Sequence, residues 1–523
     1  MIQKTFKNIG TYIRQHPKID LLILGLGLTI FLVVTLVNAP RAAIWFDEAF
    51  SVYIAQFSFW DIARYTAVDV HPPFYYWLLK VWSDLFGTTE LAFRSLSIVF
   101  GAGTIAASFF LARKLFGRQT AWLTVLFLSL SPMLIRYSDE ARMYTLAALI
   151  VVAATYVMVR AKETGSRKLW VLYGVLVSLG MWTNYFTALP WIAHWVWWGM
   201  QKWKKERGFK QNVKAVFSKE WFLTYALAVI LFAPWLVVMV RQLGVAQSGF
   251  WISPVGVDTV NNYFTNIFYY LEHGQVRSWL ALLMVVVLAA LLFAIPKAYK
   301  AFKPKERSSF WLIGLLAWLP PVFLYLVSMP PLSSSFVERY FVPSIVAAGI
   351  FGAVTIVAGT RKWKTFWRVG LVVAISGMMI FGITNVYKYG NYNKNTNTNI
   401  QTRDAVRAAQ DASNPGVPII ASSPWLFYEA IPYATDEHPI YFIDEDTGYI
   451  YGSLEMLKDN DLHKIKDLNA FEKQNPVFWY LGMGEGSTVS GYRTTWEPLR
   501  TVGPIDSYTG KLVYKATEFR INQ

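Results

Sequence analysis

Long apolar stretches recur along most of the chain, separated by shorter polar connections. A helix that crosses a hydrocarbon core of roughly 30 Å needs about 20 mostly apolar residues, and most of these stretches approach that length. They predict a polytopic α-helical membrane protein with about eleven transmembrane helices. The predicted helices are 21–38, 93–112, 119–135, 143–159, 169–186, 187–200, 221–240, 279–296, 309–328, 340–359 and 369–387.

The polar connections alternate in charge, which predicts the orientation of the chain. Lys and Arg gather on every second connection, as in loops on the cytoplasmic side of a membrane. These basic connections are 113–118, 160–168, 202–219, 297–307 and 361–368. With a cytoplasmic N-terminus and an odd number of helices, the connection after the first helix and the C-terminal segment are both predicted to be extracytoplasmic.

The first apolar run, 21–37, follows several Lys and Arg residues, so a signal peptide is the alternative to a retained helix. The apolar core exceeds the roughly 7 to 15 residues of a signal peptide, and Pro40 follows the nearest small residue, Ala39. Both features favour a spanning helix whose N-terminus is cytoplasmic.

The pattern changes after Tyr387, where a polar, Asn-rich linker begins. "TRDAVRAAQDA" is helix-like, whereas "VPIIASS", "HPIYFID" and "NPVFWYLG" are strand-like, which predicts a small α/β domain. From Lys388 onwards 13 Lys and Arg face 17 Asp and Glu, so this part does not share the basic bias of the cytoplasmic loops. We predict three parts: a transmembrane domain, 1–387; a linker, 388–401; and an extracytoplasmic α/β domain, 402–523.

Two further segments have apolar residues at helical spacing but are too polar to span a membrane, as expected of helices that lie in the interface. They either cover gaps between helices or line a substrate groove. The two apolar stripes are Phe57, Trp60, Ala63 and Ala67, and Val260, Phe264, Ile267 and Leu271.

Composition supports the membrane assignment and narrows the partners. The 523-residue chain is 54% hydrophobic and 17% aromatic, with 23 Trp, which is far beyond the surface of a soluble domain. Its net charge of +16 comes from clusters between apolar runs, which is typical of cytoplasmic membrane loops and argues against a nucleic-acid partner. The chain has no Cys, which excludes disulfides and thiolate chemistry.

The first extracytoplasmic connection carries two adjacent acids, Asp47 and Glu48, in "AIWFDEAFSVY". Aromatic residues surround them close to the membrane exit, where an unpaired charge is costly unless it is functional or paired. The structural alternative is a salt bridge to Arg41 or Arg94.

Three more polar groups are predicted at the same face, and each of them alone could be a helix cap or an interface anchor. "DVHPPFYYW" holds Asp69 and His71 before two prolines that favour a helix start. "RYSDEARMY" is predicted to be helical, with one face at i,i+4 spacing and a second pair, Asp139 and Arg142, at i,i+3. The i,i+4 face consists of Arg136, Glu140 and Tyr144. The third group is the motif "SSSFVERYF", which holds an acid, Glu338, and a cation, Arg339.

Together these groups predict one site with several carboxylates, several guanidinium groups and a hydrophobic approach. Guanidinium groups match phosphate geometry, and a carboxylate beside a phosphate can accept the proton of an attacking hydroxyl. A lipid-linked sugar phosphate meets both demands, because its chain stays in the bilayer while its phosphate lies at the interface.

Three motifs also occur in order at matching spacing: "WFDEAFS", "DVHPPFYYWLLKVWSDLFGTTELAFRSLSIVFG" and "SPMLIRYSDEARMYTL". In these the chain resembles bacterial members of the GT-C glycosyltransferase superfamily. The resemblance is to glycosyltransferase family 39, related to protein O-mannosyltransferases and to the aminoarabinose transferase of lipid A. It covers roughly residues 40–190, and the later helices by topology only.

The resemblance implies transfer of a hexose or pentose from a polyprenyl-phosphate donor to an extracytoplasmic acceptor, with inversion at the anomeric carbon. The acceptor would be a protein, a glycolipid or a cell-wall polymer. The resemblance makes Asp47 and Glu48 the catalytic pair and places His71 at the donor phosphate. Residues 138–144 match a motif that usually carries an amide where this chain has Asp139, so Asp139 either positions the motif or helps to hold a cation.

The chemistry of these residues assigns them separate roles in the reaction. We expect Asp47, rather than Glu48, to be the general base, and cationic or polar groups to bind the donor phosphate. The predicted phosphate-binding residues are His71, Arg142, Tyr144 and Arg339, and the supporting residues are Asp69, Arg136, Asp139, Glu140 and Glu338. A phosphate leaving group needs no acid catalyst. Whether a divalent cation takes part in the reaction stays open, since the sequence shows no spacing typical of metal ligands.

Two other classes of protein compete with this hypothesis. A transporter or flippase would bind a lipid phosphate without breaking a bond, but the acids cluster at one interface and no inverted repeat is visible. A sensor with a ligand-binding outer domain is the second alternative, but it assigns no function to Asp47 and Glu48.

Overall fold

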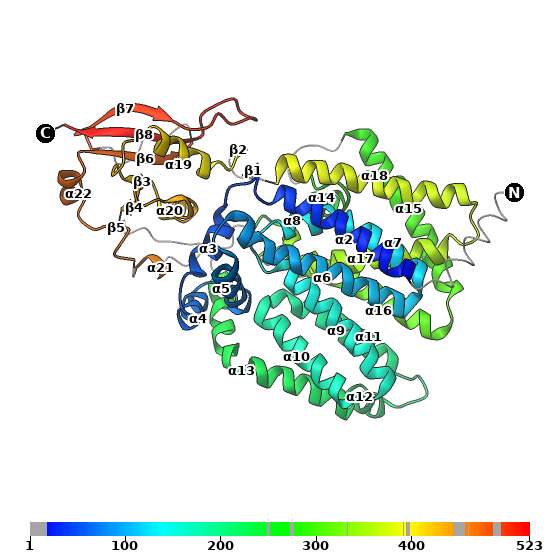
Figure 1. Ribbon diagram of the computed structural model, residues 1–523. Coiled ribbons are helices and arrows are strands. Elements are labelled where there is room, and N and C mark those ends of the chain that lie inside the picture. Colours follow the sequence, from blue (N-terminus) through cyan, green and yellow to red (C-terminus); the bar gives the residue numbers. More distant parts are fainter. Residues whose placement is uncertain are drawn as a thin grey trace.

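The computed structural model describes most of the chain. The described ranges are 18–247, 252–271, 277–331, 333–390, 392–393, 398–443, 455–458, 460–484 and 493–522, so part of the predicted linker lies outside them. Within these ranges the chain forms a bundle of long helices, a group of short helices at one end of the bundle, and a C-terminal domain built on a six-stranded sheet (Figure 1).

Eight helices within the described residues are long and apolar enough to cross a membrane, so the chain is a membrane protein. A ninth span results if two helices that meet at an angle of 57°, α7 (Arg118–Ser129) and α8 (Pro132–Ser138), cross the membrane as one unit. The eight are α2 (Lys18–Asn38), α6 (Glu90–Phe116), α9 (Tyr144–Thr164), α13 (Lys219–Gln247), α15 (Ser278–Ala301), α16 (Pro304–Val327), α17 (Val342–Gly359) with its preceding 3₁₀ turn η2 (Glu338–Phe341), and α18 (Thr365–Tyr389).

The predicted count of eleven spans is not confirmed. The two remaining predicted segments form α10 (Arg167–Thr183) and α11 (Ala188–Lys202), of 17 and 15 residues, which are shorter than any of the eight long helices. The chain turns between them through the 3₁₀ turn η1 (Tyr185–Thr187), where the Asn184 side chain accepts a hydrogen bond from the Phe186 N–H. Apolar length in the sequence therefore overstated how many helices are long enough to span.

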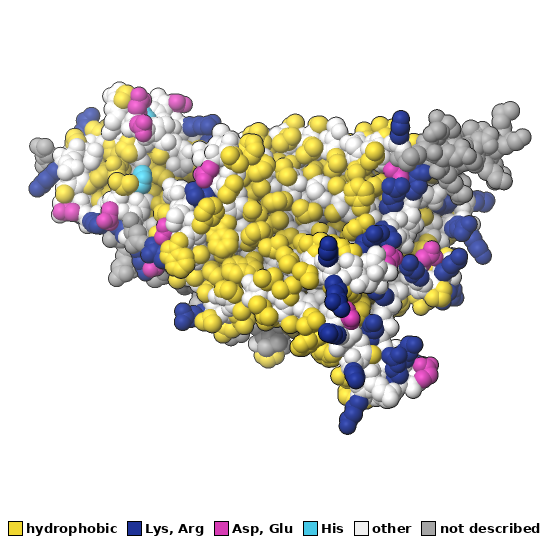
Figure 2. All heavy atoms as spheres, turned by 60° about the horizontal axis from the view of Figure 1, so that its bottom comes forward, with side chains coloured by type: hydrophobic (Ala, Val, Ile, Leu, Met, Phe, Trp, Pro, Cys, Tyr) yellow, Lys and Arg dark blue, Asp and Glu magenta, His cyan; other side chains and the backbone are white. Residues whose placement is uncertain are grey.

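The surface of the bundle agrees with a membrane environment. Figure 2 shows a broad hydrophobic surface over the bundle, with Lys and Arg side chains gathered at the end away from the C-terminal domain. Large apolar side chains such as Leu22, Ile230 and Leu292 are well over half exposed on the long helices. An apolar surface of this extent requires lipid rather than water around it.

Short helices form the end of the bundle that faces the C-terminal domain (Figure 1). They include most of the two predicted interfacial stripes, which lie on α4 and α14, although Phe57 precedes α4 and Leu271 follows α14. On α4 the side chains of Phe59 and Trp60 are exposed while Ile62 and Tyr65 are buried, so the helix presents two aromatic side chains outward. The short helices are α3 (Phe46–Ile54), α4 (Phe59–Val68), α5 (Phe74–Phe86) and α14 (Val257–Tyr269), and a further one, α12 (Phe209–Val216), lies between α11 and α13 along the chain.

Local sequence signals set several of these helix starts. Thr89 caps α6, because its hydroxyl accepts the Ala92 N–H at 3.1 Å. Pro73 precedes α5 directly, as the double proline predicts. Ser131 caps α8, whose first residue is Pro132. The ends of these helices, where the polar residues of interest lie, are therefore placed by local chemistry.

The C-terminal domain confirms the predicted α/β character. The predicted helix is α19 (Thr402–Asp411), and the predicted strands are β3 (Ile419–Ala421), β4 (Ile440–Ile443) and β6 (Val477–Met483). The sheet order is β5-β4-β3-β6-β8-β7, with β3 parallel to both β4 and β6, and β8 antiparallel to β6 and β7. The remaining elements are a two-stranded ribbon, β1 (Tyr392–Asn393) and β2 (Thr398–Asn399), with α20 (Pro424–Ala430), η3 (Ile431–Tyr433), α21 (Glu455–Lys458), β5 (Lys464–Ile465), α22 (Leu468–Gln474), β7 (Trp496–Val502) and β8 (Tyr514–Ile521).

The hydrophobic core is continuous between the bundle and the C-terminal domain. One cluster of buried apolar residues includes Ile54 of α3, Phe427 of α20 and Trp479 of β6. A second, smaller cluster lies on the other face of the sheet and includes Phe478 and Phe519. The C-terminal domain is therefore packed onto the short helices through buried apolar contact and is not merely tethered to them.

Candidate active site

Glu48 lies at the start of α3 and is fully buried in an ion pair with Arg94 of α6. The Arg94 Nε and Nη2 atoms donate to Glu48 Oε1 and Oε2 at 2.8 and 2.5 Å, and the Ala141 N–H donates to Oε1 at 2.9 Å. Arg94 also donates to three backbone carbonyls of the preceding loop, those of Ala39, Ala42 and Ala43. The salt bridge considered as the structural alternative is thus present for Glu48 and Arg94.

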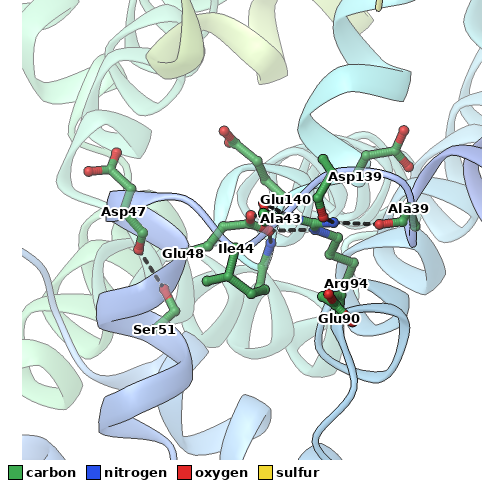
Figure 3. Close-up of polar contacts among 12 residues, drawn as sticks. Ala39, Ala43, Ile44, Asp47, Glu48, Ser51, Glu90, Arg94, Asp139 and Glu140 are labelled. Carbon is green, nitrogen blue, oxygen red and sulfur yellow. Dashed lines mark hydrogen bonds and ion pairs between the residues drawn. The ribbon is translucent and has the colours of Figure 1, made fainter. Parts of the chain in front are cut away.

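Asp47, the neighbouring residue, is placed differently. Figure 3 shows its carboxylate pointing away from Glu48 and Glu140. It is ion-paired with Arg339 of η2, whose Nη1 lies 2.7 Å from Asp47 Oδ2. Burial raises the pKa of Asp47, but the charges of Arg339, Arg142 and His71 outweigh burial, so the pKa lies below its ordinary value. Asp47 is therefore an ionised carboxylate among cationic groups.

Arg142 is the second guanidinium group at this place, and it is 3% exposed. Its Nη1 donates to the Asp47 carbonyl at 3.2 Å, to Ser51 Oγ at 3.3 Å and to Tyr76 OH at 3.0 Å. Its Nη2 lies 3.3 Å from His71 Nε2. Among the described residues its Nε has no hydrogen-bond partner, so this buried cation keeps one N–H available to a ligand.

His71 and Asp69 form a hydrogen-bonded pair, with 3.0 Å between Nδ1 and Oδ2. An arginine can only donate, so His71 Nε2 must accept from Arg142 and the proton must sit on Nδ1, which donates to Asp69. Burial and the Arg142 charge lower the pKa of His71, against the opposing effect of Asp69. The imidazole is therefore neutral, and Asp69 fixes its tautomer.

Arg136, Glu140 and Tyr270 form a second polar group beside the first. Arg136 Nη2 lies 2.8 Å from Glu140 Oε1, and its Nε donates to Tyr270 OH at 2.8 Å. Burial raises the pKa of Glu140, although Arg136 opposes this shift. Among the described residues Glu140 Oε2 is buried without a hydrogen-bond partner. Glu140 therefore supports Arg136 and keeps one oxygen unpaired.

Two other predicted residues stand near this group. The Tyr144 side chain, at the start of α9, is buried, and its hydroxyl has no hydrogen-bond partner among the described residues. Glu338 accepts a hydrogen bond from the Asn266 side chain of α14 at 3.4 Å. The acid next to Arg339 therefore bonds to α14, while Arg339 itself reaches Asp47.

The predicted helix through "RYSDEARMY" is wrong, because α8 ends at Ser138 and α9 begins only at Tyr144. The pair expected between Asp139 and Arg142 does not form: Asp139 accepts from Asn38 Nδ2 at 2.7 Å, whereas Arg142 reaches α3 and α5. The five residues between the helices form a bend, in which Asp139, Glu140 and Arg142 have partners on different elements. Only the i,i+4 ion pair of Arg136 and Glu140 survives from the helical pattern.

Asp139 occupies the position where the resembled motif carries an amide. Burial raises its pKa to about 8, and the Asn38 hydrogen bond and nearby arginines only partly oppose this. Asp139 is therefore protonated at neutral pH and is uncharged, as an amide is. Of its two proposed roles, this favours positioning of the motif over holding a cation.

A polar cavity of about 490 Å³ lies on the far side of Glu48 from Asp47. Asn38, Arg41, Trp45, Glu48, Arg94 and Asp139 line it together with the ends of α8 and α18 and residues of the C-terminal domain. Arg41, the other candidate partner of the acids, lies against the ring of Tyr387. Within the described residues no three His, Asp or Glu side chains come together to hold a metal ion.

The structure thus brings Asp47, His71, Arg142 and Arg339 together, from α3, the α4–α5 connection, the bend before α9, and η2. Sequence reasoning missed Ser51 and Tyr76, which both bind Arg142. Ser51 could have been found from its i,i+4 spacing to Asp47. Tyr76 lies in the proline motif, although nothing in the sequence separates it from the adjacent Tyr75.

Comparison with known proteins supports the resemblance predicted from the motifs. A family model described as dolichyl-phosphate-mannose-protein mannosyltransferase matches residues 70–238, which is less than half of the chain and does not include Asp47. No curated protein matches the chain significantly in sequence.

Two solved structures are similar over nearly the whole chain. The crystal structure of ArnT from Cupriavidus metallidurans in the apo state has a TM-score of 0.60 at 14% identity, covering 95% of this chain and 97% of that chain. The structure of the same protein bound to undecaprenyl phosphate has a TM-score of 0.58 at 15% identity, with the same coverage. At this identity the likeness is one of fold. The predicted resemblance is confirmed, and the chain has the GT-C glycosyltransferase fold.

Proposed function

We propose that the protein is a membrane glycosyltransferase that moves a sugar from a polyprenyl-phosphate donor to an acceptor hydroxyl on the extracytoplasmic side. The observation that carries this proposal is one ionised carboxylate, Asp47, that faces two guanidinium groups, Arg339 and Arg142, at one end of the bundle. The similar ArnT structure that holds undecaprenyl phosphate supports a lipid-phosphate donor.

The proposed reaction is a single displacement. The acceptor oxygen attacks the anomeric carbon as its proton passes to an Asp47 carboxylate oxygen, and the bond between that carbon and the phosphate oxygen breaks. Polyprenyl phosphate leaves with the bonding electron pair and needs no proton, since phosphate is a stable anion. Attack opposite the leaving group inverts the configuration.

The cationic residues act on the phosphate. Arg339 and Arg142 lie beside Asp47 and compensate the charge that develops on the departing phosphate, an effect that is often the largest in such reactions. The neutral His71 is held by Asp69 and keeps the Arg142 guanidinium in orientation. Arg339 also binds Asp47 directly. A donor phosphate would share the Arg339 charge and so leave Asp47 a stronger base.

The position of the site also supports this role. The Lys and Arg side chains gather at the end of the bundle away from the C-terminal domain (Figure 2), and the positive-inside rule predicts that this end is cytoplasmic. An apolar cavity of about 470 Å³ between α7, α14, α15, α16, α17 and α18 is lined by side chains such as Phe264, Leu288 and Trp318. It offers apolar volume for part of a lipid chain.

The test is release of free polyprenyl phosphate by the purified protein, measured against a panel of hexosyl and pentosyl donors with protein, glycolipid and cell-wall acceptors. We expect release with one donor class, and loss of release in Asp47→Asn. Movement of an intact donor across vesicles without release would instead support the lipid-phosphate transporter or flippase.

A further inference from the structure

The connection between α11 and α13, residues 203–218 with the short helix α12, is folded against the bundle at the end away from the C-terminal domain (Figure 1). The buried Asn212 side chain of α12 holds the loop before it. Asn212 Oδ1 accepts from the Lys204 N–H at 2.9 Å, and Nδ2 donates to the carbonyls of Lys204 and Arg207 at 2.9 and 3.0 Å. The Trp198 Nε1–H of α11 donates to the Val216 carbonyl at 2.9 Å. This connection, the α12 segment, is therefore an ordered surface.

The α12 segment exposes three large aromatic side chains. Trp203, Phe209 and Phe217 are 48%, 73% and 54% exposed. The rings of Trp203 and Phe209 lie against each other, with centres 6.0 Å apart. Aromatic side chains gather where a membrane meets water, because their rings are stable in the headgroup region. The exposed rings therefore favour contact with the lipid headgroup region over contact with bulk water.

The same part of the chain is strongly basic. Residues 202–219 contain seven Lys and Arg and a single acid, Glu206. Lys210 and Lys214 are both exposed and lie i,i+4 on one face of α12. Within the described part of the chain none of these cations is ion-paired with a carboxylate. The basic residues are Lys202, Lys204, Lys205, Arg207, Lys210, Lys214 and Lys219.

The basic connection at 113–118 shows the opposite arrangement. Arg113 and Arg118 both bind the buried Asp20, at 2.9 and 2.7 Å, and Lys114 binds Glu163 at 2.8 Å. Acids of the chain thus compensate the charge of that connection. The α12 segment has no such acids among the described residues, so anions from outside the chain must compensate its charge.

We propose that the α12 segment is a binding surface for the headgroups of anionic phospholipids in the leaflet around this end of the bundle. The exposed rings enter the headgroup region, and the Lys and Arg side chains contact the lipid phosphates. A cluster of about four to eight Lys and Arg beside a transmembrane helix attracts acidic lipids, with about fivefold in binding for each cation near the surface. The proposal goes beyond the transfer reaction and does not depend on it.

The absence of Cys makes a site-specific test possible. Gln211 is exposed on α12, so Gln211→Cys gives the full-length protein a single thiol for a fluorescent label. The labelled protein is placed in phosphatidylcholine nanodiscs with equal fractions of either spin-labelled phosphatidylglycerol or spin-labelled phosphatidylcholine. A spin label quenches fluorescence on close approach, so the ratio of the two quenching values measures local enrichment of the anionic lipid. Both leaflets of a nanodisc have the same composition, so the result does not depend on orientation.

We expect phosphatidylglycerol to quench about 3- to 10-fold more than phosphatidylcholine at low salt, and the preference to fall at high salt. Replacing two cations of α12 together, by Lys210→Gln and Lys214→Gln, should lower the preference about twofold or more. The matched control removes two exposed lysines of the C-terminal domain, by Lys466→Gln and Lys473→Gln, and should leave the preference unchanged.

Two further measurements separate charge from apolar contact. Phe209→Ala should lower quenching by both lipids to the same extent, because the ring carries no charge. In the unlabelled protein, amide exchange in residues 209–217 should slow when phosphatidylglycerol is added to the nanodisc. Equal quenching by the two lipids at low salt would overturn the proposal. A preference that survives replacement of Lys210 and Lys214, or that falls equally in the control, would also overturn it.

Discussion

Asp47 and Glu48 are chemically similar neighbours whose surroundings divide their roles. Glu48 is fully buried and satisfied by Arg94 and a backbone N–H, so it has no oxygen left for a substrate. Asp47 is 19% exposed and is ion-paired with Arg339. A base must reach its substrate, and of the two acids only Asp47 can do so.

The first prediction separates these two acids. Asp47→Asn keeps the size of the side chain but cannot accept the acceptor proton, so turnover should fall by about 10² to 10⁴ with donor affinity nearly unchanged. Glu48→Gln leaves the buried Arg94 charge uncompensated and should lower the unfolding free energy by up to about 3 to 5 kcal/mol. Sugar transfer, donor affinity and Tm are measured on the same preparations. Full turnover by Asp47→Asn would exclude the base assignment.

The second prediction concerns the donor phosphate. Arg142→Ala should weaken donor binding by roughly 1.5 to 3 kcal/mol, the range for a hydrogen bond to a charged group. Arg142→Lys should restore binding only in part, because an ammonium group cannot contact Asp47, Tyr76 and the phosphate in one fixed geometry. Donor titration by fluorescence or calorimetry measures the effect. Unchanged affinity in a folded Arg142→Ala protein would make this arginine a structural residue.

The third prediction is a pH dependence that Asp139 causes. Its pKa is about 8 in the folded protein, above the ordinary value of 3.8, so the folded state binds this proton more tightly than the unfolded state. That contribution to stability is complete below the ordinary pKa and is lost as the pH rises towards 8. Asp139→Asn stays uncharged at every pH. The Tm of the wild type should therefore fall relative to Asp139→Asn between pH 5 and pH 9, and parallel curves would contradict the assignment.

At the scale of the elements, α18 is held by close contact at Gly382. A Cβ there would lie 2.4 Å from Pro132 Cγ and 2.6 Å from the Phe268 carbonyl oxygen, and the backbone oxygen cannot move aside cheaply. Gly377 on the same helix has nothing within 4 Å of an added Cβ. Gly382 therefore reports on the packing of α18 against α8 and α14, and Gly377 serves as a matched control on the same helix.

The fourth prediction uses this comparison. Gly382→Ala should lower the unfolding free energy by about 1 to 3 kcal/mol, as overpacking does. Gly377→Ala should leave it unchanged or raise it by up to about 1 kcal/mol, since Ala favours the helix. Thermal unfolding in detergent measures both variants. Equal Tm values for the two variants would contradict the close approach of α18 to α8 and α14.

The elements also show what the sequence could predict. Apolar length located every long helix of the bundle, and strand patterns located β3, β4 and β6. Both signals are local. The bend at 139–143 was not predicted, because Arg136, Glu140 and Tyr144 fit a helical face, whereas the partners of Asp139 and Arg142 are remote in sequence. For the same reason the motifs named Asp47, His71, Arg142 and Arg339, which the structure brings together, but not how they pair.

At the scale of the whole molecule, orientation remains a prediction from charge. Asp47 lies on α3, which packs against α20 of the C-terminal domain. Lys and Arg side chains gather at the end of the bundle away from that domain (Figure 2). The side of the membrane that the Asp47 end of the bundle faces decides which compartment supplies the acceptor. This holds whatever the number of spans.

The fifth prediction tests this orientation. A reporter fused after Tyr389, at the end of α18, should behave as extracytoplasmic, and one fused after Lys205 should behave as cytoplasmic, because the basic loops stay inside. Paired phosphatase and fluorescent-protein fusions provide the measurement, and protein amount by immunoblot is the control. The reverse result at either position would place the site in the cytoplasm and exclude an extracytoplasmic acceptor.

The ion pair between Asp47 and Arg339 has a consequence for how the protein is made. Glu48 meets Arg94 after only 46 further residues, whereas Asp47 meets Arg339 after 292. At about 5 to 20 residues per second, the ribosome needs about 15 to 60 s to deliver that arginine. The Glu48–Arg94 ion pair can thus form early during membrane insertion. The Asp47–Arg339 ion pair can form only after η2, which precedes α17, has been synthesised. We expect a nascent or truncated chain to be inert towards lipid-linked sugars, so that the enzyme becomes active only when its synthesis is nearly complete.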